Sequence, residues 1–132
     1  MSEPRTRSQR MAGLALQRVE QVAAGNTDLA RDYRTRALGF PALVMQSGLA
    51  QAVGFLRAKS GDDIGNGYGR FLADLAAVVG VADGEKLHKR IIAASLPEYR
   101  LLTRDALDAG GWIKRFVQTL LKSESDHPDA AS

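Results

Sequence analysis

The chain has 132 residues, of which 45% are hydrophobic and 25% charged, and this composition is typical of one folded domain with its own core. It contains no cysteine, which excludes disulfides, thiol nucleophiles and cysteine-ligated metal sites. The formal net charge is +3, but residues 123–132 carry three acids and no Lys or Arg. The other 18 basic and 12 acidic residues give the body a charge of +6, which suits a polyanion or an acidic protein surface as partner.

The first residues are polar, and no apolar run approaches the ~20 residues that cross a bilayer. We therefore expect neither secretion nor membrane insertion. The absence of cysteine agrees with a reducing compartment. These features favour a cytoplasmic protein.

Helical periodicity dominates the first half of the chain. An amphipathic helix is predicted over residues 5–24, ended by Gly25 and Asn26, because apolar side chains recur at helical spacing at Met11, Leu14, Ala15, Val19 and Val22. Asp28 is placed to cap a second helix, which we expect to break at Gly39, with Pro41 beginning the next. Residues 42–59 are apolar on most sides of the helix and predict a buried segment at the centre of the core. A bend of this helix at Gly48 is an open alternative.

The second half begins with residues 60–69, a Gly-rich and Asp-rich stretch that predicts a flexible loop. A helix ending at Gly80 should follow, and Asp83 is placed to cap a further one that carries Leu87, Ile91 and Ile92. No strand pattern occurs, so residues 1–122 predict an all-α fold, a compact single-domain bundle of about five to six helices. Residues 123–132 predict a disordered acidic tail.

The last predicted helix, residues 97–122, separates into two faces. At ~100° per residue the basic side chains fall within about a third of the circumference, and they are Arg100, Arg104, Lys114, Arg115 and Lys122. The opposite face is apolar and consists of Leu102, Ala109, Ile113, Phe116 and Leu120. The pair Gly110-Gly111 lies between the two basic clusters, and a kink there would rotate one cluster away from the other.

A basic stripe ~33 Å long is a plausible track for the phosphates of a nucleic acid, although most charged helix faces are simply solvated. Trp112 and Tyr99 border the stripe and are candidates for stacking on bases. Such aromatic residues are more often packed in a core, and this alternative is favoured for Trp112.

The sequence offers no catalytic constellation. The glycine-rich residues 65–69 have no preceding strand and no following Gly-Lys-Ser/Thr, which a phosphate-binding loop requires. His88 and His127 are isolated, Asp62-Asp63 sits in a loop where acids are usually hydrated, and Ser47 and Ser95 lack a nearby histidine. We therefore predict no catalytic residue, no metal site and no cofactor.

Two blocks carry a family resemblance. Residues 33–59 read Y-R-T-R-A-L-G-F-P-A-L-V-M-Q-S-G-L-A-Q-A-V-G-F-L-R-A-K, and residues 99–116 read Y-R-L-L-T-R-D-A-L-D-A-G-G-W-I-K-R-F. Together they resemble the small subunit of the type III-B (Cmr-type) CRISPR RNA-guided effector complex, over residues 10–122. The glycine-rich loop and the acidic tail match no motif of this family.

The resemblance implies a non-catalytic, all-helical subunit in antiviral defence. Several copies would stack along the backbone filament that holds the guide RNA and would stabilise the bound target RNA, while the isolated chain would be monomeric. Its partners would be the other complex subunits, the guide RNA and the target RNA, with no membrane.

On this basis the candidate phosphate contacts are Arg57, Lys59, Arg100, Arg104, Lys114, Arg115 and Lys122, with Arg10 and Arg18 as weaker candidates. Arg18 lies beside the apolar face of the first helix and has packing or pairing with an acid as its alternative role. Two rival functions stay open, namely a protein–protein adaptor without direct nucleic-acid contact and an enzyme with a scattered site.

Overall fold

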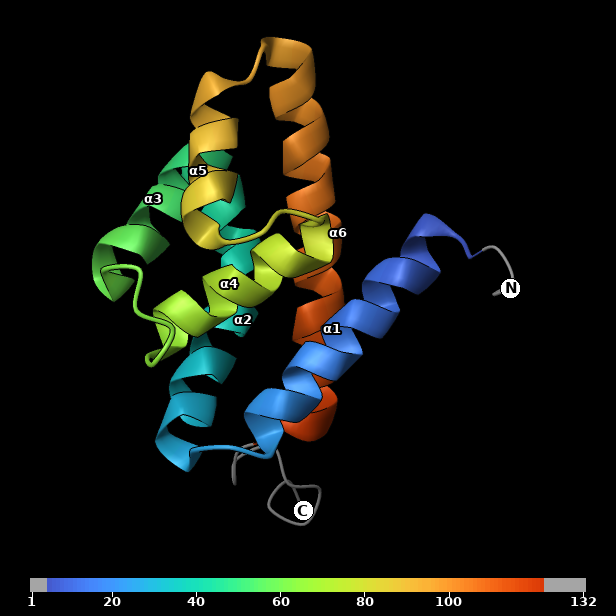
Figure 1. The fold of residues 1–132 in the computed structure, drawn as a ribbon, viewed down its shortest axis with the longest axis vertical. Coiled ribbons are helices and arrows are strands. Elements are labelled where there is room, and N and C mark those ends of the chain that lie inside the picture. The colour runs from blue at the N-terminus through green and yellow to red at the C-terminus, as the bar shows by residue number, and fades with distance from the viewer. Residues whose placement is uncertain (1–4, 123–132) are drawn as a thin grey trace.

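The computed structural model describes residues 5–122, which form a bundle of helices without a strand (Figure 1). This confirms the predicted all-α fold with its six helices, α1 (Arg7–Ala23), α2 (Thr27–Ser47), α3 (Leu49–Ser60), α4 (Gly67–Val79), α5 (Gly84–Ala93) and α6 (Leu96–Leu120). None of these helices is long and apolar enough to cross a membrane. The predicted acidic tail, residues 123–132, lies outside the described residues.

Helix α1 begins at a capping box, in which Thr6 accepts a hydrogen bond from the Gln9 amide while the Gln9 side chain accepts one from the Thr6 amide. Its buried face consists of Met11, Ala15, Val19 and Val22, as the periodicity predicts, whereas Leu14 is 41% exposed. The helix crosses α6 and also contacts α4 (Figure 1).

The predicted break at Gly39 and Pro41 is wrong, because α2 continues through both residues to Ser47. Pro41 removes one backbone hydrogen-bond donor, but the adjacent Phe40 and Val44 are buried, and their packing holds the helix together across this point. The chain turns instead at Gly48, whose φ of +80° favours glycine. Gly48 therefore separates two helices, α2 and α3, and is not a bend within one helix.

Helix α3 starts without a side-chain cap from its own residues. The hydroxyl of Tyr99 on α6 takes this role by accepting a hydrogen bond from the Ala50 amide at 3.1 Å. Tyr99 is half-buried against the core and therefore holds two helices together. This contact gives Tyr99 a structural role.

Helix α4 is the centre of the core, rather than the predicted segment 42–59. It crosses the front of the molecule in Figure 1 and contacts all five other helices. Asn66 caps it by accepting a hydrogen bond from the Gly69 amide, so the helix begins inside the predicted loop. Gly67 and Gly69 are buried in its first turn, where side chains would collide with Asp32 and Asp63.

A fully buried carboxylate on α4, Asp74, joins three helices. It accepts hydrogen bonds from the Tyr33 hydroxyl of α2 at 2.8 Å and from Arg70 Nε at 3.1 Å, and Arg18 of α1 approaches it to 3.4 Å. Burial raises the pKa of Asp74, while Tyr33 and Arg70 act in the opposite direction. Burial also raises the pKa of Tyr33, so the phenol stays protonated and donates.

The last two helices run antiparallel after a short turn, and α5 packs on α3 and α4 (Figure 1). Asp83 caps α5 as predicted, accepting a hydrogen bond from the Lys86 amide at 2.8 Å. Leu87 and Ile91 are buried, but Ile92 is 66% exposed and does not join the core. Ser95 caps α6, which ends at Leu120 rather than at the predicted residue 122.

Helix α6 passes through Gly110 and Gly111 without a break. The two glycines differ in environment, because a Cβ at Gly110 would lie 2.8 Å from the ring of Phe40, whereas one at Gly111 would meet nothing within 4 Å. Gly110 thus allows α6 to approach α2 closely.

We expect Gly110→Ala to lower the free energy of unfolding by about 1–3 kcal/mol, because the core would be overpacked. Gly111→Ala should raise it by about 0.5–1 kcal/mol through better helix propensity. Urea denaturation of the two variants and the parent chain would measure both changes. Equal effects at the two positions would contradict the close approach at Gly110.

Candidate nucleic-acid interface

The outward face of α6 is basic, and its inward face is apolar. Its buried residues are Leu102, Ala106, Ala109, Gly110, Ile113 and Val117. This agrees with the predicted division into two faces, although Phe116 is only half-buried and Leu120 is 40% exposed. The apolar face is therefore rotated slightly from its predicted position.

Three of the predicted phosphate contacts lie exposed on this outward face, namely Arg100, Arg104 and Arg115. Lys114 is half-buried at its edge, and Lys122 lies beyond the end of the helix. Among residues 5–122, no carboxylate is within ion-pair distance of Arg100 or Arg115, and Arg104 has only a long contact of 3.6 Å with Asp105. We call Arg100, Arg104 and Arg115 the α6 basic face.

The two acids beside this face, Asp105 and Asp108, are bound by Arg7 at the start of α1. One guanidinium nitrogen of Arg7 donates to Asp108 at 2.8 Å, and another donates to Asp105. These hydrogen bonds raise the pKa of Arg7, which therefore stays charged. No local pattern predicts this pairing, because the partners are 98 and 101 residues apart.

Trp112 lies on the seam between the α6 basic face and α1. Its ring stacks with Phe116 at a centroid distance of 5.9 Å, and the Arg115 guanidinium lies 5.6 Å from its centroid. The side chain is half-buried, and it lines a hollow of about 320 Å³ together with Ser8 and Arg115. The core packing that the sequence favours for Trp112 therefore accounts for only part of its side chain, and the rest lines this hollow.

Arg57 and Lys59 do not join the α6 basic face. They lie at the end of α3 opposite to the Tyr99 contact, beside the loop of residues 61–66 (Figure 1). Arg57 donates two hydrogen bonds to Asp62, at 2.8 and 2.6 Å, while Lys59 is exposed near the ring of Phe55. The predicted contact residues therefore form two separate groups.

The Arg57–Asp62 ion pair lies beside a histidine, and the pKa values of both Asp62 and His88 are lowered. Hydrogen bonds from Arg57 lower the pKa of Asp62. Burial, and to a smaller extent the charge of Arg57, lowers the pKa of His88. His88 lies 3.3 Å from Arg57 and packs beside Gly54. Arg57 would have to leave Asp62 before it could bind a phosphate with both nitrogens.

We expect Asp62→Asn to raise the affinity for single-stranded RNA more than Asp63→Asn does. Both substitutions remove one negative charge, but only the first releases Arg57, since Asp63 bonds to the Gly65 amide instead. A released arginine adds about one phosphate contact and therefore a salt slope of about −0.7. Fluorescence anisotropy would measure this, and equal effects would show that Arg57 does not contact RNA.

The weaker candidates also have distinct positions. Arg18 approaches Asp74 and therefore takes its alternative role, pairing with an acid. Arg10 is exposed on α1, where it lines a different hollow from the one beside Trp112. Within residues 5–122, no group of three His, Cys, Asp or Glu side chains is placed to hold a metal ion.

Similarity to known proteins covers nearly all of the helical body. The family model described as "CRISPR-associated protein (Cas_Cmr5)" matches residues 7–120. The CRISPR system Cmr subunit Cmr5 of Thermus thermophilus is 39% identical over 118 residues, which cover 89% of this chain and 98% of that protein. The crystal structure of a CRISPR-associated Cmr5 family protein from the same organism matches with a TM-score of 0.79 and 38% identity, covering 90% of this chain and 100% of that one.

Proposed function

Because the chain belongs to the Cmr5 family and is thus the small subunit of a Cmr (type III-B) CRISPR complex, we propose that it binds RNA through the α6 basic face. The observation that carries this proposal is the set of three exposed arginines on one side of a continuous helix, with the neighbouring acids bound by Arg7. Charges that have no close partner in the described chain are available to phosphates.

The contacts would be independent of sequence. Arginines that neutralise phosphates release counterions, while the pairing of guide and target reads the bases. The small subunit would therefore stabilise target RNA along the guide-bearing filament, with several copies side by side and each isolated chain monomeric. Lys114 and Lys122 would extend the contact at the edge and the end of α6.

We further propose that the chain supplies no catalytic group and acts in the cytoplasm. Two-metal cleavage of RNA requires carboxylates clustered around the ions. The acids near the α6 basic face are instead held in ion pairs by Arg7, which points to a structural role for them.

The salt dependence of binding tests the RNA proposal. Three phosphate contacts predict that the logarithm of the affinity of the isolated chain for single-stranded RNA falls with a slope of about −2 against the logarithm of salt concentration. Fluorescence anisotropy between ~50 and ~200 mM salt would measure this slope. A slope near zero, or no binding at the lowest salt, would favour the protein–protein adaptor instead.

A further inference from the structure

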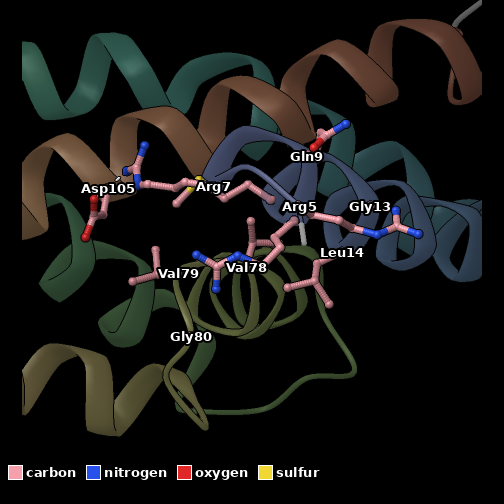
Figure 2. A pocket seen from close by; sticks show the side chains of 11 residues that line it. Arg5, Arg7, Gln9, Gly13, Leu14, Val78, Val79, Gly80 and Asp105 are labelled. Atoms are coloured by element: carbon pink, nitrogen blue, oxygen red, sulfur yellow. Dashed lines mark hydrogen bonds and ion pairs between the residues drawn. The ribbon is translucent and has the colours of Figure 1, made fainter. Parts of the chain in front are cut away.

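A groove between α1 and the end of α4 has no role in the RNA interface. Its volume is about 580 Å³, and its apolar surface comes from Met11 and Leu14 of α1 and from Val78 and Val79 of α4. Figure 2 shows the side chains of Leu14, Val78 and Val79 around this hollow, with Arg7 extended toward Asp105. We call it the α1–α4 groove.

The groove is open because two of its residues are glycines. A Cβ built at Gly13 on α1 or at Gly80, which ends α4, would meet nothing within 4 Å. Leu14 beside them is 41% exposed, although the neighbouring Met11 and Val78 are buried. An apolar surface of this kind is available to an apolar side chain from outside.

The border of the groove is positively charged. Arg5 and Arg10 line it, and no carboxylate of residues 5–122 is within ion-pair distance of either. Arg7 is different, because Asp105 and Asp108 already occupy its guanidinium. Two cations therefore remain beside an aliphatic surface.

This combination favours a protein segment over a nucleic acid. No aromatic side chain of the described chain lines the groove, so it lacks the platform on which an unpaired base would stack. Asp105 also lines it, on the side toward the α6 basic face, and its charge is paired with Arg7. An apolar side chain flanked by Asp or Glu would satisfy both the aliphatic surface and the two arginines.

We propose that the α1–α4 groove binds an acidic segment of a neighbouring protein subunit in the Cmr complex, with one apolar side chain inserted and carboxylates paired with Arg5 and Arg10. The inference rests on family membership and not on RNA binding by α6. The chain would thus use two separate surfaces, one for RNA and one for protein.

Site-specific photo-crosslinking in the purified complex tests this. With p-benzoylphenylalanine at Leu14 of the full chain, irradiation should yield a crosslink to another subunit, at a peptide that contains an apolar residue flanked by Asp or Glu. A crosslink to RNA, to residues 123–132 of this chain, to a second copy, or to a peptide without acids would overturn the proposal. The absence of any crosslink would overturn it as well.

Two substitutions of the full chain give an independent readout. Gly13→Leu should occupy the groove, since a Cβ at this position meets nothing within 4 Å, and Arg10→Glu should repel the acidic segment, so each should reduce the crosslink at least tenfold. Gly39→Leu is the matched control, because Gly39 is another helical glycine with open space around it. RNA affinity of the isolated Gly13→Leu chain should not change, so failure of this inference is distinguishable from failure of RNA binding. An undiminished crosslink in a folded Gly13→Leu variant would contradict the groove as the site.

Discussion

Reversing two charges of the α6 basic face, by Arg104→Glu with Arg115→Glu, is expected to weaken binding of single-stranded RNA by about tenfold or more at ~0.1 M salt. Each lost phosphate contact removes about 0.7 from the salt slope, so the slope should weaken from about −2 to less than about 1 in magnitude. Fluorescence anisotropy across a salt series would give both quantities, and circular dichroism would confirm that the variant is folded.

The control makes the same change in net charge on α5. Lys86 and Arg90 are exposed, and neither has an ion-pair partner among residues 5–122. The variant Lys86→Glu with Arg90→Glu should therefore lose little more affinity than its reduced net charge explains. If the two double variants bind RNA equally weakly, only the overall charge matters and the α6 basic face is not the site.

Removing the buried carboxylate, by Asp74→Ala, is expected to lower the free energy of unfolding by about 3–5 kcal/mol. The substitution leaves the Tyr33 hydroxyl buried without its acceptor, and it takes from Arg70 and Arg18 the anion that joins them. Urea denaturation followed by circular dichroism would measure the loss. Because α1, α2 and α4 meet at this carboxylate, unfolding should stay cooperative while its midpoint falls.

Asp74→Asn provides the contrast. Burial raises the pKa of Asp74, so the folded chain disfavours its ionised form relative to the unfolded chain, and the destabilising effect develops as pH rises from the ordinary value through the raised one. The asparagine amide still accepts a hydrogen bond from Tyr33 without the buried charge. We therefore expect Asp74→Asn to lower the free energy of unfolding much less than Asp74→Ala does. Relative to the parent chain, the asparagine variant should become more stable as the pH rises toward neutral. Equal costs for the two variants would show that charge pairing outweighs hydrogen bonding at this position.

The helices follow from local patterns, and most of them could be predicted. Apolar residues at helical spacing indicate the buried face of α1, and Asp83 is predictable as the cap of α5 because a cap and its helix are neighbours in sequence. The exception is α2, where Gly39 and Pro41 resemble an end signal. Buried Phe40 and Val44 outweigh that signal, and packing against other helices is not visible in a local window.

The candidate site is predictable in outline, and its details are not. The position of Arg104 and Arg115 on one side of a helix depends only on helical geometry, and the helix runs without a break through Gly110 and Gly111 between them. The partners of Arg7 are unpredictable, since they lie 98 and 101 residues away. Arg57 has an acid five residues away, but only the loop geometry brings Asp62 back to it.

The amino-acid sequence alone established an all-helical chain of the Cmr type, with a basic face on its last helix, because helix periodicity, capping and family motifs are all encoded in short stretches. Packing of the six helices decided which charges remain available. It pairs Arg7 with two acids, leaves Arg100 and Arg115 unpaired among the described residues, and opens the groove between α1 and α4. Charge availability depends on distances between residues remote in sequence, and those distances exist only once the core around α4 has formed.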